Sequence, residues 1–252
     1  MEIYYNDNLF PSGYFFEGMV QMKLTPRLQA VADKVPPGAR VADIGTDHAY
    51  IPVFLLMNHL SSGVIATDSR TGPLQTASET LELFRLKQMA ELRLGEGLTV
   101  LRKEDDIDVI IIAGLGGDTI CSILADGIEG FRNDILLILQ PMTCVGKVRT
   151  WLAENGFAII EEDIAQEESS YYEIIVARWS GDANLAETKY LSLGPDLVTR
   201  KHPLLKPMLE QRLEHKEAAL AGAEYSNSPA AQDRIEELKA EILSMREVLQ
   251  CL

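Results

Sequence analysis

The sequence predicts an α/β fold in which helices cover both faces of a mostly parallel sheet, followed by a C-terminal antiparallel helical hairpin. Short apolar runs alternate with helical patterns from Thr25 onward, as in a parallel sheet with crossover helices. Most of these runs lack polar and apolar alternation, which is typical of strands buried on both faces. After Gly181 the apolar residues instead recur every three or four positions, the spacing of a coiled-coil seam.

Five apolar runs are predicted as parallel strands, and four segments between them as helices. The predicted strands are 40–44, 64–67, 91–94, 108–113 and 135–139. The predicted helices are 50–58, 73–86, 119–124 and 145–155. Pro73 suits a first helical position, and Gly156 suits a helix end. Two later runs, 157–168 and 171–179, have the length and separation of an antiparallel pair, so the whole sheet is expected to have seven strands.

The C-terminal part of the chain is predicted as two helices. The first covers 203–221, and Ser228 before Pro229 suits the N-terminal cap of the second. The apolar stripes are Leu205, Leu209, Leu213 and Leu220 in the first helix and Ile235, Leu238, Ile242, Met245, Leu249 and Leu252 in the second. These stripes suit either an intramolecular hairpin or the seam of a homodimer, so both a monomer and a homodimer stay open.

Composition indicates a protein with a substantial core that does not coat nucleic acid indiscriminately. The chain has 252 residues, of which 46% are hydrophobic, and its 23 basic against 38 acidic residues give a net charge of -15. A local basic patch is compatible with that balance. Cys121, Cys144 and Cys251 lack metal-ligand spacing, so no metal site is expected. No apolar run approaches the roughly 20 residues of a membrane helix, and no signal peptide is recognised, so a cytoplasmic protein is expected.

The turn after the first predicted strand, within "RVADIGTDHAYIPVFLL" (40–56), suits a cationic ligand. In an open parallel sheet the ligand lies at the carboxyl ends of the strands, beside this turn. A dinucleotide site wants several glycines there, because the pyrophosphate approaches bare backbone. Only Gly45 is present, and the carboxylates of Asp43 and Asp47 would repel a pyrophosphate. S-adenosylmethionine carries an ammonium and a sulfonium and no phosphate, so it is the expected cofactor.

Further candidate cofactor contacts follow the other strands. Asp68, with Ser69 beside it, ends the second strand, where an acid can bind both ribose hydroxyls. Glu96, next to Gly97, follows the third strand and is expected near the adenine amino group. Ala113 and Gly114 end the fourth strand, and Arg27 in "LTPRL" is a candidate for a phosphate or for the cofactor carboxylate. The alternatives are ordinary caps and turns for the acids and a solvated surface position for Arg27.

Several motifs, in order, resemble the bacterial TrmK family of tRNA adenine-N1 methyltransferases that modify position 22. They are "LTPRLQAVADKVPPGARVADIGTDHAYIPVFLL", "GPLQTA", "VIIIAGLGG", "LILQP" and "YYEIIVA", and the similarity covers about residues 22 to 250. The resemblance implies a Rossmann-like class I methyltransferase domain, S-adenosylmethionine as methyl donor, and a C-terminal coiled coil that helps hold tRNA. Alternatives are a methyltransferase for another RNA site or a small molecule, and a non-catalytic binding protein with the same fold.

Two departures accompany this resemblance. Met142 follows "LQP", where the family often has Asn, and residues 1–21 have no counterpart that we recognise. The expected division of the chain is an N-terminal extension of unassigned role (1–21), the S-adenosylmethionine-binding methyltransferase domain (22–180) and the helical coiled-coil domain (181–252).

The acceptor base is expected beside the loops after strands four and five, 114–118 and 140–143. Gly116 and Gly117 would let a base approach the backbone, unless they only permit a tight turn. Gln140, followed by Pro141, can offer both a donor and an acceptor to an adenine edge.

The turn itself carries three further catalytic candidates. Asp47 is the candidate for stabilising the cationic methylated adenine, or else for binding the cofactor ammonium or capping the next helix. His48 either orients the loop or contacts the base, and Tyr50 either faces the acceptor or packs in the core.

Phosphates of tRNA are expected to meet a run of basic residues that opens the helical hairpin, together with two basic residues near the acceptor loops. The alternative is a solvated helix of mixed charge. The candidates are Lys147, Arg149, Arg200, Lys201, Lys206, Arg212 and Lys216.

Overall fold

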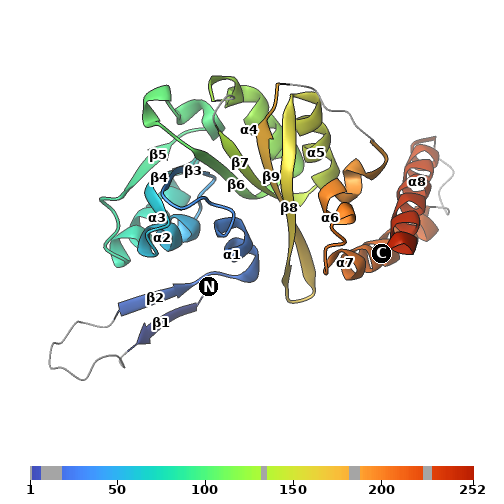
Figure 1. The fold of residues 1–252 in the computed structure, drawn as a ribbon, viewed down its shortest axis with the longest axis horizontal. Coiled ribbons are helices and arrows are strands. Elements are labelled where there is room, and N and C mark those ends of the chain that lie inside the picture. Colours follow the sequence, from blue (N-terminus) through green and yellow to red (C-terminus); the bar gives the residue numbers. More distant parts are fainter. Residues whose placement is uncertain (1, 7–18, 132–134, 182–187, 224–228) are drawn as a thin grey trace.

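The fold is built around one seven-stranded sheet. The computed structural model describes residues 2–6, 19–131, 135–181, 188–223 and 229–252. The strand order is β5-β4-β3-β6-β7-β9-β8 (Figure 1). The five strands from β5 to β7 run parallel to one another, and β9 pairs antiparallel with both β7 and β8. The strands are β3 (Ala39–Ile44), β4 (Ser61–Asp68), β5 (Ala90–Leu94), β6 (Val109–Gly116), β7 (Leu136–Thr143), β8 (Phe157–Glu167) and β9 (Ser170–Trp179). The predicted seven-stranded sheet is confirmed.

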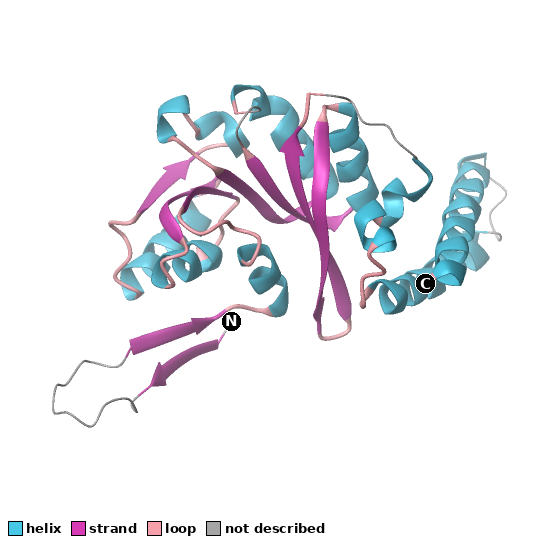
Figure 2. Cartoon of the chain, viewed as in Figure 1, coloured by secondary structure: helices cyan, strands magenta, loops and turns pink. Residues whose placement is uncertain are grey.

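Helices pack on both faces of this sheet (Figure 2). Successive strand residues enter opposite cores: Val41 lies in the cluster beneath the first group of helices, and Ala42 lies in the cluster beneath the second. Because both faces are buried, the strand sequences have no polar alternation. The first group is α1 (Pro26–Ala32), α2 (Tyr50–Met57) and α3 (Thr71–Leu83), and the second is α4 (Gly117–Gly127) and α5 (Val145–Glu154). Short 3-10 helices η1 (Gly97–Val100), η2 (Lys103–Asp105) and η3 (Ile128–Gly130) connect strands and helices on the way.

Element bounds differ from the sequence prediction where strand pairing or helix starts are irregular. Strands β6 and β7 continue beyond the predicted ends because Gly116 pairs with Thr143 across two register shifts. Helix α3 begins two residues before Pro73, which still lies in the first turn, where a missing N–H costs no helical hydrogen bond.

The first residues form a separate two-stranded antiparallel sheet that the sequence analysis did not predict. Strands β1 (Glu2–Asn6) and β2 (Met19–Lys23) pair from Glu2 with Lys23 to Asn6 with Met19. Strand β2 crosses the expected domain boundary at residue 22 and leads into α1.

The C-terminal helices form the predicted hairpin. The segment contains η4 (Thr188–Leu193), α6 (Pro195–Thr199), α7 (Leu205–Ala223) and α8 (Pro229–Cys251). Helices α7 and α8 are antiparallel, since Lys201 before α7 donates to the carbonyl of Cys251 at the end of α8. The expected cap Ser228 lies outside the described residues. The seam buries Leu205, Leu209, Leu238, Ile242 and Met245 as expected, and it adds Met208 and Val248.

A buried ion network fixes α6 and α7 to the antiparallel edge of the sheet. In α5, Arg149 donates from Nε to Glu162 at 2.6 Å and from Nη2 to Glu173 at 2.5 Å, and all three side chains are fully buried. Glu173 also accepts from Arg212 of α7. Glu162 and Asp196 of α6 exchange backbone-to-carboxylate hydrogen bonds at 2.9 and 3.0 Å. Burial opposes the ionisation of Glu173, but the two arginines outweigh it and hold the pKa of this carboxyl below its ordinary value.

Breaking the network at its centre should destabilise the protein strongly. Replacing Arg149 with Met leaves two buried carboxylates short of a partner, which costs about 3–5 kcal/mol in the free energy of unfolding measured with urea. Lys147→Met on the same helix is the matched control: its side chain is 66% exposed, so the change should stay within about 1 kcal/mol. If the urea unfolding midpoint of Arg149→Met equalled that of Lys147→Met, the stabilising role of the ion network would be contradicted.

Candidate functional site

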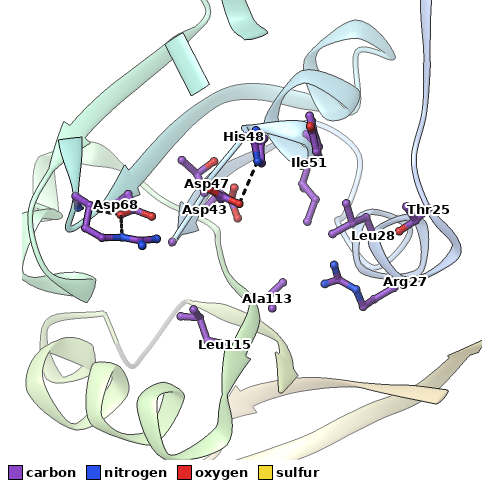
Figure 3. A pocket seen from close by; sticks show the side chains of 15 residues that line it. Thr25, Arg27, Leu28, Asp43, Asp47, His48, Ile51, Asp68, Ala113 and Leu115 are labelled. Atoms are coloured by element: carbon purple, nitrogen blue, oxygen red, sulfur yellow. Dashed lines mark hydrogen bonds and ion pairs between the residues drawn. The ribbon is translucent and has the colours of Figure 1, made fainter. Parts of the chain in front are cut away.

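A cleft of about 440 Å³ opens at the carboxyl ends of β3, β4 and β6 (Figure 3). The strand order places β4 on one side of β3 and β6 on the other, so the loops leaving these strands diverge and open a crevice between them. Residues from α1, the β3–α2 turn, the end of β4 and the end of β6 line it. They are Thr25, Arg27, Leu28, Asp43, Gly45, Thr46, Asp47, His48, Tyr50, Ile51, Asp68, Arg70, Ala113, Gly114 and Leu115.

The β3–α2 turn owes its shape to left-handed backbone. Gly45 has a φ of 77°, and a Cβ there would lie 3.4 Å from the Leu115 side chain. Asp47 and Ala49 are also left-handed, at 48° and 56°, which is unusual outside glycine. Helix α2 begins after Ala49 without a side-chain cap, so the alternative that Asp47 caps this helix is wrong. The turn instead directs Asp47 and its neighbours to the cleft.

Acidic side chains gather on one side of the cleft. Asp43 is 5% exposed, and burial, opposed by the Thr46 hydroxyl, raises the pKa of its carboxyl to about 6. Asp68 is 7% exposed and accepts the Arg70 backbone N–H at 2.9 Å. Asp47 is the exposed member, with 60% of its side chain in solvent. This side can therefore hold a cation and accept hydrogen bonds from hydroxyl groups.

Two rings stack beside Asp47. The His48 and Tyr50 rings lie 5.0 Å apart between centroids and are nearly parallel, at 8°. His48 Nε2 lies 3.3 Å from a carboxylate oxygen of Asp47. Burial and then the Asp47 charge raise the pKa of the Tyr50 phenol, which keeps it protonated. The sequence candidates Asp47, His48 and Tyr50 thus form one unit at the cleft.

The opposite side of the cleft carries a fixed cation. Figure 3 shows Arg27 and Leu28 across the cleft from Asp43, Asp47 and Asp68. Arg27 donates from Nη1 to the side-chain oxygen of Gln140 at 2.8 Å. The cleft therefore has Arg27 on one side and three aspartates on the other, where Arg70 also lies, 3.6 Å from Asp68.

Both the oxygen and the nitrogen of the Gln140 amide are hydrogen-bonded within the protein. Its oxygen accepts from Arg27 and also from the Gly114 N–H at 3.1 Å, and its nitrogen donates to the Pro141 carbonyl at 3.1 Å. The same nitrogen lies 3.6 Å from the sulfur of Met142. Because Gln140 is fully buried and its amide is bonded, the expectation that it reads an adenine edge is wrong. Its position instead orients Arg27.

Gly116 and Gly117 lie beside the β7–α5 turn and do not line the cleft. A Cβ on Gly117 would lie 2.6 Å from the carbonyl oxygen of Thr143 and 2.7 Å from that of Cys144. The nearest atom to a Cβ on Gly116 is the Thr143 hydroxyl, at 3.3 Å. This geometry favours the tight-turn alternative for Gly117, because backbone already fills the space beside it.

Nine of the predicted site residues line the cleft and seven do not. The nine are Arg27, Asp43, Gly45, Asp47, His48, Tyr50, Asp68, Ala113 and Gly114, whereas Ser69, Glu96, Gly97, Gly116, Gly117, Gln140 and Pro141 lie outside the lining. The loop with Glu96 still adjoins Asp68, whose carbonyl accepts the Gly95 N–H at 3.0 Å. Six further lining residues were not predicted: Thr25, Leu28, Thr46, Ile51, Arg70 and Leu115. Thr25 had a signal, since it precedes Pro26 as a helix cap would, yet its buried hydroxyl makes no hydrogen bond within the described chain.

The basic residues expected to meet RNA have different surroundings. The expectation for Arg149 is wrong, because its side chain is fully buried between two glutamates. Lys147, Arg212 and Lys216 line a groove of about 650 Å³ between the β7–α5 turn and helices α7 and α8. Lys206 has a side chain that is 62% exposed. The carboxylate partners are Asp118 for Lys147, Glu173 for Arg212, Glu241 for Lys216, Asp196 for Arg200 and Glu210 for Lys206, and Lys201 donates to a carbonyl.

In the part of the chain that the structure describes, no group of three or more His, Cys, Asp or Glu side chains is placed to hold a metal ion. Nor does that part contain a helix both long and apolar enough to cross a bilayer.

Comparison with known proteins gives one consistent family. The model of the TrmK family, tRNA (adenine(22)-N(1))-methyltransferase, matches residues 41–247. The tRNA (adenine(22)-N(1))-methyltransferase of Bacillus subtilis is 33% identical over 237 residues, which cover 92% of this chain and 99% of that protein. The crystal structure of the B. subtilis m1A22 tRNA methyltransferase TrmK has a TM-score of 0.81 at 33% identity, with 91% and 100% of the two chains covered. A Streptococcus pneumoniae protein in complex with S-adenosyl-L-methionine has a TM-score of 0.80 at 31% identity, with 90% and 100% covered.

The two glycines should respond differently to a methyl group. Gly117→Ala forces a Cβ against backbone carbonyls, and such overpacking costs about 1–3 kcal/mol in unfolding free energy. Gly116→Ala is the control, because the Thr143 hydroxyl can rotate away, and its cost should stay within about 0.5 kcal/mol. Thermal and urea unfolding measure both. Equal stability of the two variants would count against the packing role of Gly117.

Proposed function

The chain belongs to the TrmK family of tRNA (adenine(22)-N(1))-methyltransferases, and on this premise we propose how its cleft carries out the reaction. The protein is a methyltransferase that transfers a methyl group from S-adenosylmethionine to N1 of an adenine in tRNA. The observation that carries the residue-level proposal is the division of the cleft into a basic side with Arg27 and an acidic side with Asp43, Asp47 and Asp68.

The charge pattern of the cleft fits this cofactor. S-adenosylmethionine has a carboxylate and an ammonium at one end, a ribose diol in the middle and no phosphate. Arg27 would hold the carboxylate, Asp43 the ammonium and Asp68 the ribose hydroxyls. The buried Thr25 hydroxyl, which has no partner within the described residues, can add a hydrogen bond. A volume of about 440 Å³ is ordinary for a small-molecule site.

The protein's contribution to the transfer is mainly alignment. When bound, the cofactor supplies a methyl group on a positively charged sulfur, and adenine N1 accepts it through a lone pair it already has. No protein nucleophile is needed, and orienting two reactants can lower a barrier by about 7–11 kcal/mol. Fixing Arg27 through Gln140 serves this alignment, because it sets where one end of the cofactor lies.

Asp47 is the proposed electrostatic partner of the adenine. Methylation at N1 leaves the base cationic, so a carboxylate near that atom stabilises the developing charge. Asp47 is exposed at the cleft, whereas Asp43 and Asp68 are buried deeper, so Asp47 is the acid that an incoming base meets. His48 would hold the Asp47 carboxylate, and the His48–Tyr50 stack offers a ring face near the acceptor.

We propose that the tRNA brings its adenine to the cleft from the side of the C-terminal helices. Lys147, Lys206 and Lys216 are the cations we propose for phosphate contacts, and Met142, 44% exposed near the end of β7, can pack on a base. We further propose that the enzyme works in the cytoplasm as a monomer or homodimer. Because the reaction needs alignment of two reactants and no Lewis acid, we propose that it needs no metal.

Methylation of tRNA tests the function directly. Purified protein incubated with S-adenosylmethionine and unmodified tRNA should produce 1-methyladenosine, identified by mass spectrometry of the digested nucleosides. Asp47→Asn should lower the turnover number by about 10²-fold, the usual effect of losing one electrostatic contact in a transition state. Asp126→Asn, an exposed acid on α4, is the control and should turn over normally.

Two outcomes of this assay would contradict the proposal. Folded protein that binds the cofactor but methylates no adenosine would overturn the function. Full turnover by Asp47→Asn would remove Asp47 from the mechanism and leave the function intact.

The buried Asp43 makes cofactor affinity dependent on pH. Its pKa of about 6 means that the carboxyl keeps its proton at lower pH, whereas a cationic ammonium binds the ionised form. Affinity measured by calorimetry should therefore rise with pH up to about 6, by at most about tenfold per pH unit, and level off near pH 7. Asp43→Asn should bind weakly at every pH, whereas Asp68→Asn should bind weakly and keep the rise. A flat profile for the unmodified protein would exclude Asp43 as the ammonium partner.

A further inference from the structure

The first residues of β9 are tied to the C-terminal helices. Tyr171 packs against the buried apolar cluster of α6, α7 and α8. Glu173, fully buried, accepts from Arg212 of α7. The carbonyl of Ser169, just before the strand, accepts from the side chain of Gln211 at 2.8 Å. These contacts set the position of the strand's start relative to α7.

Tyr172, between these two residues, contacts Arg27, which lines the cleft. Side chains alternate along a strand, so Tyr172 lies on the opposite face from Tyr171 and Glu173. The Arg27 guanidinium carbon lies 5.5 Å from the centroid of the Tyr172 ring. This is within the range of a cation–π interaction.

Arg27 has three close neighbours. Gln140 accepts a hydrogen bond from its Nη1 at 2.8 Å, and its guanidinium carbon lies over the Tyr172 ring. The third neighbour is Gly114, where a Cβ would lie 3.5 Å from Nη1 of Arg27. Because Arg27 also lines the cleft, the part of the guanidinium that these neighbours leave uncovered is available to a ligand.

We propose that Tyr172 is a positioning residue for methyl transfer, which holds Arg27 in the cleft and connects its placement to α7 through the start of β9. Docking of the C-terminal helices on the sheet then sets the affinity for the cofactor even without tRNA. The proposal rests on the proposed function, since S-adenosylmethionine is its ligand. It gives the helical hairpin a second task beside RNA binding.

Cofactor affinity without tRNA is the test, measured by calorimetry with S-adenosylmethionine. Tyr172→Leu removes the ring and should weaken binding by about 3- to 30-fold, the range that corresponds to a cation–π contact. Tyr172→Phe keeps the ring and should bind within about twofold of the unmodified protein. Trp179→Leu is the matched control, because this aromatic residue is also partly buried on β9 but lies seven residues from Tyr172. Its affinity should not change.

A substitution in α7 tests whether this helix influences cofactor binding through β9. Arg212→Gln should also weaken cofactor binding in the absence of tRNA, whereas a residue that only contacts tRNA would leave this affinity unchanged. In methylation assays Tyr172→Leu should raise KM for S-adenosylmethionine and leave kcat nearly unchanged. In an Arg27→Met background, Tyr172→Leu should cause no further loss, because the group it positions is gone. Should Tyr172→Leu fail to fold, Tyr172→Ile, a better strand former, takes its place.

The outcomes separate this proposal from the function on which it rests. Unchanged affinity in Tyr172→Leu, or an equal loss with and without Arg27, would overturn the positioning role alone. Cofactor binding by the unmodified protein without adenosine methylation would overturn the function. The cofactor affinities of the Tyr172→Leu and Arg27→Met variants would then still decide the positioning role. Absence of any cofactor binding by the unmodified protein would overturn both.

Discussion

The buried amide of Gln140 is the interaction on which the cleft depends. Its oxygen joins the end of β7 to the Gly114 N–H at the end of β6 and to Arg27 in α1. Gly114 has a φ of 77°, so its backbone turns away from the regular ladder and would lose a hydrogen bond without this acceptor. One side chain therefore holds the strand end and the cation together. Because the acceptor of the hydrogen bond from the Arg27 guanidinium is the neutral amide of Gln140 and not a carboxylate, the positive charge of Arg27 is not neutralised by this bond.

The acidic side has a different origin, in the topology of the sheet. The reversal of strand order beside β3 brings the ends of β3 and β4 to the same crevice, where Asp43 is the next-to-last residue of β3 and Asp68 is the last residue of β4. The left-handed residues of the next turn add Asp47 without the glycines that a pyrophosphate would need. A cleft that is basic on one side and acidic on the other selects a ligand with both charges at one end. The same sheet ends in β8 and β9, whose buried glutamates fix the helical hairpin through Arg149 and Arg212.

The strands and the acidic residues near their ends could be predicted from the sequence, because both depend on local sequence pattern. The strands were found because burial on both faces removes polar alternation, and Asp43, Asp47 and Asp68 were found because they end strands or follow them. The use of Gln140 was not predictable, since an amide bonds equally well to a base, a guanidinium or backbone, and only the fold decides. Arg149 was misjudged for a similar reason: arginine is usually exposed, and its partners lie 13 and 24 residues away in separate strands. Tyr172 belongs to the motif "YYEIIVA", but its contact with Arg27 was not predictable, because the two residues meet only in the folded chain.

The central claim is that the two charged sides of the cleft orient the cofactor. A crystal structure of the protein with S-adenosylhomocysteine measures this most directly. The charge division predicts the ligand carboxylate within hydrogen-bond distance of Arg27, its ammonium beside Asp43 and its ribose hydroxyls on Asp68. A ligand whose carboxylate lies away from Arg27, or whose ribose lies away from Asp68, would contradict the claim.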